Sequence, residues 1–135
     1  MAFLFVAWAF LIAILVQVFF AGLALFDNSS FWSSHRDFGY YIFLPGLILL
    51  VLVFFARFPR RMIGMTTLLF GLYMLQTILP TLRGVAPLVA AFHPVNAIIL
   101  FTVSVIVAWR SRAFVPAPLG TAKALEAAAD ESAES

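Results

Sequence analysis

Four long apolar stretches constrain this chain more than any other feature. They span residues 2–26, 38–58, 62–82 and 86–109, and each is close to the length of about 20 residues that a helix needs to cross a bilayer. Only 10% of the 135 residues are charged, and the mean hydropathy is +1.09. A chain this short cannot bury so much apolar surface in a water-soluble core. The sequence therefore predicts an all-α integral membrane protein, an antiparallel four-helix bundle in a lipid bilayer.

The polar residues divide the chain into two parts and suggest an orientation. Residues 1–112 form the predicted four-span domain, and residues 113–135 form a polar, acidic tail that we expect to be disordered or transiently helical. Arginines cluster after the second and fourth spans, whereas the other two loops contain only Arg36 and Arg83. Because cytoplasmic loops carry the excess of Lys and Arg, we predict that both termini lie in the cytoplasm.

Several classes of function are not indicated. The absence of cysteine excludes disulfides, thiolate metal sites and cysteine nucleophiles. No Asp or Glu lies within a predicted span, so we do not expect a proton-coupled carrier. No Ser–His–acid set, phosphate-binding loop or zinc motif is present. We therefore predict no catalytic residues, favour a protein that is not an enzyme, and expect no binding of nucleic acid.

The few polar residues inside the spans form a repeat. The chain has two glutamines and two histidines, and Gln17 precedes His35 by 18 residues while Gln76 precedes His93 by 17. Each glutamine lies in a helix that runs outward, and each histidine lies near the start of the next helix. This pattern favours two similar helical hairpins in tandem, an arrangement known in membrane proteins. It places both histidines at the outer side of the membrane.

Two functional interpretations of the histidines remain open. An imidazole at membrane depth usually faces the bundle and has a partner, and a pair on facing helices could supply the axial ligands of one haem. Alternatively, His93 bonds a backbone carbonyl, such as one freed by Pro94, and His35 is an interfacial, solvated residue. Ser34 and Asp37 resemble a capping box, which would put His35 in the first turn of its helix. Pro94 suggests that the fourth helix begins properly beside His93.

Five further side chains could contribute to such a site. The amides of Gln17, Gln76 and Asn96 could orient an imidazole or bond the edge of a ligand, although amides also join helices directly. Arg36 and Arg83 could pair with haem propionates, because arginine binds carboxylates through two parallel hydrogen bonds. Solvated loop arginines are the alternative for these two residues.

These motifs resemble those of a known group of proteins. The stretch from Gln17 to Gly22, then His35 with Gly39, and the motif Phe92-His93-Pro94-Val95-Asn96-Ala97 resemble a family of small four-helix bacterial membrane proteins of uncharacterised function. The resemblance implies the fold and a bacterial inner membrane, but no activity.

A looser similarity connects the chain with one half of haem A synthase. Each half of that enzyme is a four-helix bundle with paired histidines near the outer side, so the resemblance implies that His35 and His93 are an axial pair. The chain lacks the acidic residue that the catalytic half carries near its first ligand. The similarity therefore implies haem binding rather than synthase activity.

The leading hypothesis is a multi-pass membrane protein that binds one b-type haem between His35 and His93 in the outer leaflet, for electron transfer or haem handling. The alternative is a cofactor-free structural or accessory subunit whose partners are other membrane protein subunits. A chlorophyll-type pigment on a single histidine is a third hypothesis.

Overall fold

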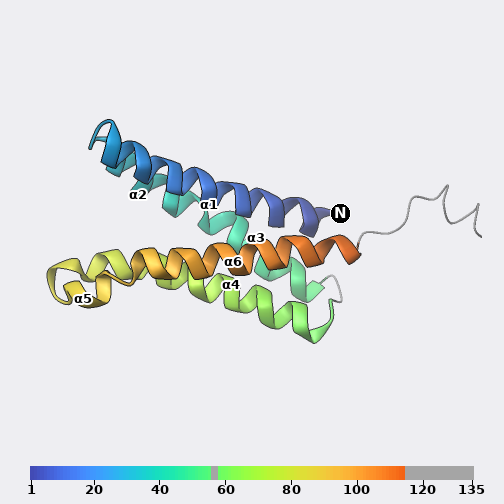
Figure 1. The fold of residues 1–135 in the computed structure, drawn as a ribbon. Helices are drawn as coiled ribbons and strands as arrows, with labels where there is room; N and C mark the ends of the chain where they lie inside the picture. Colours follow the sequence, from blue (N-terminus) through green and yellow to red (C-terminus); the bar gives the residue numbers. More distant parts are fainter. Residues whose placement is uncertain (56–57, 115–135) are drawn as a thin grey trace, which may run out of the picture.

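The computed structural model describes residues 1–55 and 58–114, and all regular structure within these residues is helical. The chain forms four antiparallel spans (Figure 1), and all four are long and apolar enough to cross a membrane. The predicted fold class is confirmed, and the chain is a membrane protein by these criteria. Most of the predicted tail, residues 115–135, lies outside the described residues. The elements are α1 (Ala2–Phe26), α2 (Phe31–Tyr41), α3 (Phe43–Phe55), α4 (Arg60–Ile78), the 3₁₀ helix η1 (Leu79–Gly84), α5 (Pro87–Ala90), α6 (His93–Ser111) and the 3₁₀ helix η2 (Arg112–Phe114).

The second span begins earlier than its apolar stretch. α2 starts at Phe31, after Ser30, and no side chain caps it. The capping-box interpretation is therefore wrong, because Ser34 lies within the first turns of a helix that has already begun. The span is interrupted at Ile42, between α2 and α3. Pro45 explains the interruption, since it has no N–H to donate to the carbonyl four residues earlier.

Prolines also shape the third and fourth spans. α4 gives way to the 3₁₀ helix η1 at Leu79, and Pro80 stands at the start of η1. α6 begins at His93 with Pro94 in its first turn, where a missing N–H costs nothing. The helix was expected to begin at Pro94, with His93 near its cap and residues 88–92 as a loop; it begins one residue earlier, at His93. The short α5 precedes it, so the chain turns back before the histidine.

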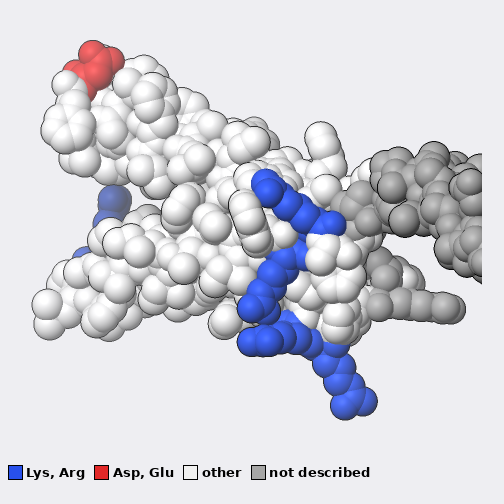
Figure 2. Space-filling model, turned by 45° about the vertical axis from the view of Figure 1, so that its right-hand side comes forward, with Lys and Arg blue, Asp and Glu red and all other residues white. Residues whose placement is uncertain are grey.

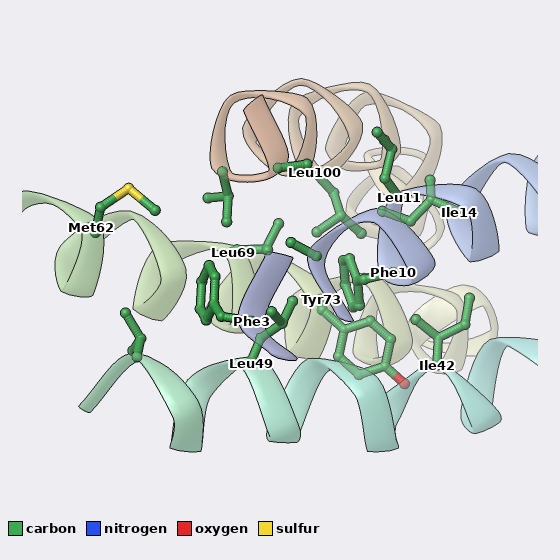
Figure 3. Packing of buried hydrophobic residues seen from close by; sticks show 14 residues of the cluster. Phe3, Phe10, Leu11, Ile14, Ile42, Leu49, Met62, Leu69, Tyr73 and Leu100 are labelled. Carbon is green, nitrogen blue, oxygen red and sulfur yellow. The ribbon is translucent and has the colours of Figure 1, made fainter. Parts of the chain in front are cut away.

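The core lies where the helices pack as a square. α1 packs against the second span and α6, and α4 packs against α3 and α6. Along α1 the buried Phe3, Ala7, Phe10 and Ile14 recur every three or four residues, which places them on one helix face. Figure 3 shows these side chains meeting apolar residues of the other helices. Gln17 continues the same stripe, one turn beyond Ile14, so its side chain is directed at the bundle.

The two ends of the bundle differ in packing and in charge. At the end far from the N-terminus, the α1–α2 hairpin diverges from η1 and α5 (Figure 1). Figure 2 shows a notch between these two hairpin ends, with acidic side chains on one of them. The opposite end carries a belt of basic side chains (Figure 2), contributed by the ends of α4 and α6 and by η2. We call these the open end and the basic end.

Candidate functional site: a histidine pair between two hairpins

His35 is fixed by the glutamine of the preceding helix. Its Nδ1 lies 2.9 Å from the backbone oxygen of Gln17, and the side-chain amide of Gln17 donates to the backbone oxygen of His35. A carbonyl oxygen can only accept, so Nδ1 must carry the proton. The neutral ring therefore keeps Nε2 as an unprotonated nitrogen with a lone pair.

His93 repeats this arrangement in the second hairpin. Its Nδ1 lies 3.1 Å from the backbone oxygen of Gln76, which again fixes the proton on Nδ1. Its Nε2 lies 3.2 Å from Nε2 of Gln76, so the amide donates to the ring. The acceptor is not a carbonyl freed by Pro94 but the backbone oxygen of Gln76 in the neighbouring span.

The repeat seen in the sequence is thus a repeat of contacts. In each hairpin, a histidine near the start of the returning helix bonds the carbonyl of a glutamine on the outgoing helix. The two rings meet in a T-shaped contact between the hairpins, with centroids 6.3 Å apart and planes inclined by 76°. Trp32 packs its ring against His35 at 5.6 Å. The structure therefore brings together His35, His93, Gln17 and Gln76.

The two hairpins differ in what holds the glutamine. Asn96 is 5% exposed and donates to Oε1 of Gln76 at 2.6 Å and to the backbone oxygen of Leu72 at 3.0 Å. The first hairpin has Phe38 at the matching place, three residues after its histidine. Accordingly, Oε1 of Gln17 is buried and has no hydrogen-bond partner within the described residues. One acceptor at the site therefore remains unsatisfied.

Two residues that we had not assigned to the site support it. A Cβ on Gly39 would lie 2.8 Å from Nε2 of Gln17, so a larger residue would have to move that amide from its present place. The hydroxyl of the buried Tyr73 donates to the backbone oxygen of Gly39 at 2.9 Å, which ties α4 to α2. The sequence signal was available, because Gly39 lies one turn after His35 and Tyr73 lies one turn before Gln76.

The two arginines lie on the elements of the open end but are not engaged with the histidines. Nε of Arg36 pairs with Oδ1 of Asp37 at 2.8 Å, and both side chains are mostly exposed. Arg83 is exposed in η1, and within residues 1–55 and 58–114 it makes no ion pair. Their predicted role toward propionates stays a prediction.

The donor set itself limits the kind of metal site. In the part of the chain that the structure describes, no three His, Cys, Asp or Glu side chains gather closely enough to hold a metal ion. Two imidazoles alone do not make a tetrahedral zinc site, which takes three or four protein ligands. They do match the axial positions of a tetrapyrrole, because its own nitrogens supply the equatorial ligands.

Comparison with known proteins identifies no relative of known function. Residues 17–82 match the sequence profile of a family of unknown function, DUF6220. No curated protein and no solved structure matches the chain. The match is consistent with a small protein of an uncharacterised family, and it includes Gln17, His35 and Gln76. It ends before the Phe92–Ala97 motif, so the resemblances based on that motif and on haem A synthase stay predictions.

Proposed function

We propose that this chain is a multi-pass membrane protein that binds one b-type haem between His35 and His93. The observation that carries the proposal is that the two imidazoles have the same hydrogen bond at Nδ1. In both, Nδ1 is held by a glutamine carbonyl, which leaves Nε2 as the ligating nitrogen. Histidines that bind metals almost always donate their other N–H in this way, because it fixes the tautomer and raises ligand basicity.

The spacing of the rings supports the same proposal. Two imidazoles on opposite sides of one iron have ring centres roughly 6 Å apart, since each metal–nitrogen bond is about 2 Å and each ring adds about 1 Å. The centroids of His35 and His93 are 6.3 Å apart.

The chain's own residues would set how such a site works. A b-type haem supplies a one-electron couple when bound. Ligation by two histidines leaves no open axial position, which favours electron transfer over substrate chemistry. The amide of Gln76 occupies Nε2 of His93 in the structure and must leave before that nitrogen can ligate. Because this hydrogen bond can be exchanged for a bond to iron, His93 would also suit a protein that takes up haem and passes it on.

The location of the site follows from the charge distribution. We propose that the basic end faces the cytoplasm of a bacterial inner membrane, with both termini there. Arg60, Arg61, Arg110 and Arg112 all belong to that end among the described residues. The histidine pair would then lie in the outer leaflet, where a periplasmic or membrane-bound electron carrier could reach it.

One observation favours the competing hypothesis of a cofactor-free accessory subunit. Both ring nitrogens of His93 already have hydrogen-bond partners on Gln76, so the second hairpin is closed without a ligand. In that case the glutamine–histidine pairs would serve only to join neighbouring helices.

Absorption spectroscopy separates the two hypotheses. The full chain would be produced with haem supplied, purified, and its spectrum recorded oxidised and after dithionite. We expect the sharp reduced bands of a low-spin b-type haem at one haem per chain. His35→Ala and His93→Ala should each lose the low-spin bands, and free imidazole should restore them in His93→Gly by filling the vacated ligand position.

The matched control is Thr81→Ala. Thr81 lies at the open end, and its hydroxyl bonds only the local carbonyl of Ile78, so this variant should keep the spectrum of the unmodified protein. A colourless protein would contradict the proposal and favour the accessory subunit. Low-spin haem that survives both histidine substitutions would contradict the ligand assignment.

A further inference from the structure

The basic end contains a second candidate site, independent of the histidines. A cavity of about 580 Å³ opens between the start of α4, the end of α6 and η2. Its lining combines arginines with apolar side chains. The residues that matter for its chemistry are Arg61, Met62, Trp109, Arg110, Arg112 and Phe114.

Arg112 is the central feature of this cavity. Its guanidinium carbon lies 4.7 Å from the ring centre of Trp8 on α1 and 4.3 Å from that of Trp109 on α6. Contacts with two indole rings orient the cation through cation–π attraction. The N–H donors of a guanidinium point outward in its plane, so rings over its faces leave them available.

The described residues offer these donors no anion. The one ion pair within residues 1–55 and 58–114 joins Arg36 to Asp37 at the open end. Of the other two arginines in the lining, Arg110 contacts the sulfur of Met65 at 3.6 Å, and Arg61 is exposed. Three cationic side chains therefore converge on a cavity without a carboxylate opposite them.

The remaining wall of the cavity is apolar and well supported. The rings of Phe114 and Phe58 are 4.9 Å apart, and Phe58 packs on Phe3 at 4.6 Å. Met62, also in the lining, is 3% exposed. A ligand that fits this site carries a negative headgroup next to a hydrocarbon segment.

We infer that the cavity at the basic end binds an anionic phospholipid, with its phosphate on Arg112 and Arg61 and an acyl chain along Phe114. The cavity lies where two membrane-spanning helices end, which is the depth of lipid headgroups. Basic pockets between transmembrane helices are known to hold anionic headgroups. Arginine suits phosphate because its planar fork forms two parallel hydrogen bonds.

Native mass spectrometry of the full chain in detergent, with phosphatidylglycerol or phosphatidylcholine added, tests this inference. We expect retained phosphatidylglycerol and little phosphatidylcholine. Arg112→Gln should weaken retention of phosphatidylglycerol about fivefold or more. Arg61→Gln should also weaken it, and this exposed residue provides a second variant if Arg112→Gln does not fold.

The matched control is Arg60→Gln. Arg60 stands next to Arg61 at the start of α4 and carries the same charge, but it is not part of the cavity lining. The control substitution should change retention less than about twofold. If Arg60→Gln and Arg112→Gln lost phosphatidylglycerol to the same extent, the lipid would be held by the overall positive charge of this end and not by the cavity. That result would overturn the inference. Equal retention of both lipids, or displacement of the lipid by millimolar inorganic phosphate, would overturn it too. The same holds if lipid binds only after residues 115–135 are removed, because the acidic tail would then be the native partner.

Discussion

At the scale of single residues, two glutamines perform two separate tasks. The two backbone carbonyls make the same contact, since each accepts a hydrogen bond from Nδ1 of a histidine. The two side-chain amides make different contacts. The amide of Gln17 bonds the backbone of His35, whereas that of Gln76 bonds the ring of His93. Only a side-chain substitution can separate these tasks, because it leaves the carbonyls in place.

The difference predicts how fast each ligand becomes available. In Gln76→Leu, Nε2 of His93 loses its hydrogen bond, and a typical bond of this kind is worth about 1 kcal/mol. We therefore expect haemin to associate with Gln76→Leu about fivefold faster than with the unmodified protein. Gln17→Leu is the control, since its amide does not touch an imidazole nitrogen. Stopped-flow absorbance measures both rates, and equal acceleration in the two variants would show that Gln76 does not compete for the ligand nitrogen.

The sequence was informative about which residues belong together, but not about how they touch. The repeat of Gln17–His35 and Gln76–His93 was visible because polar residues are rare in apolar spans. It could not reveal that the glutamine carbonyls are the acceptors, because every residue has a carbonyl and none is marked in the sequence. The unsatisfied Oε1 of Gln17 likewise depends on Phe38 standing where the second hairpin has Asn96.

At the scale of elements, Gly39 lies at the contact between α1 and α2, beside the Gln17 amide. Gly39 gives the Gln17 amide the space that a methyl group would occupy. The same residue accepts a hydrogen bond from Tyr73, so it connects the first hairpin with α4. A change at this position should therefore affect both the packing of α2 and the position of His35.

We expect Gly39→Ala to be about 1 kcal/mol less stable than the control Gly71→Ala, because it costs the hydrogen bond of the Gln17 amide. The added methyl group must displace the Gln17 amide from the backbone oxygen of His35. Gly71→Ala is the matched control, because a Cβ there meets nothing within 4 Å and alanine is the better helix former. Unfolding in mixed micelles measures both variants. Equal stability of Gly39→Ala and Gly71→Ala would mean that the close approach at Gly39 is not required.

Element boundaries show where hydropathy misleads. The start of α2 was placed too late because the stretch from Ser33 to Asp37 is polar. A helix can extend beyond the apolar part of a span, as α2 does. The interruption at Ile42 was foreseeable from Pro45, whereas the early start at Phe31 was not, since no side chain caps it. Helix boundaries could be predicted where a proline removes a backbone N–H. They could not be predicted where the end of the apolar stretch was taken as the end of the helix.

At the scale of the whole molecule, the two ends of the bundle differ in how their helices pack. The basic end is packed by aromatic rings around Phe58 and by the Trp8–Arg112–Trp109 contact. The open end has the notch between the hairpins (Figure 2). This asymmetry, together with the proposed orientation, puts the histidine pair and the arginine cavity at opposite membrane surfaces.

The orientation can be measured directly because the chain has no cysteine. Ser29→Cys, in the exposed loop before α2, should react with a membrane-impermeant maleimide added outside intact cells. Ala2→Cys, exposed at the start of α1, should react only after the cells are opened. The physical reason is the excess of arginine at the basic end, which favours retention in the cytoplasm. The reverse labelling pattern would place the histidine pair on the cytoplasmic side.

The repeated hairpins lie in one chain, so the two halves can differ in sequence. In a symmetric dimer of one hairpin, every substitution would appear twice and both copies would have identical surroundings. Joining the hairpins in one chain removes that restriction. Phe38 stands in one hairpin and Asn96 at the matching place in the other, so the amide of Gln76 is hydrogen-bonded at its oxygen and that of Gln17 is not. The single chain thus combines a repeated pair of helices with different chemistry around each histidine.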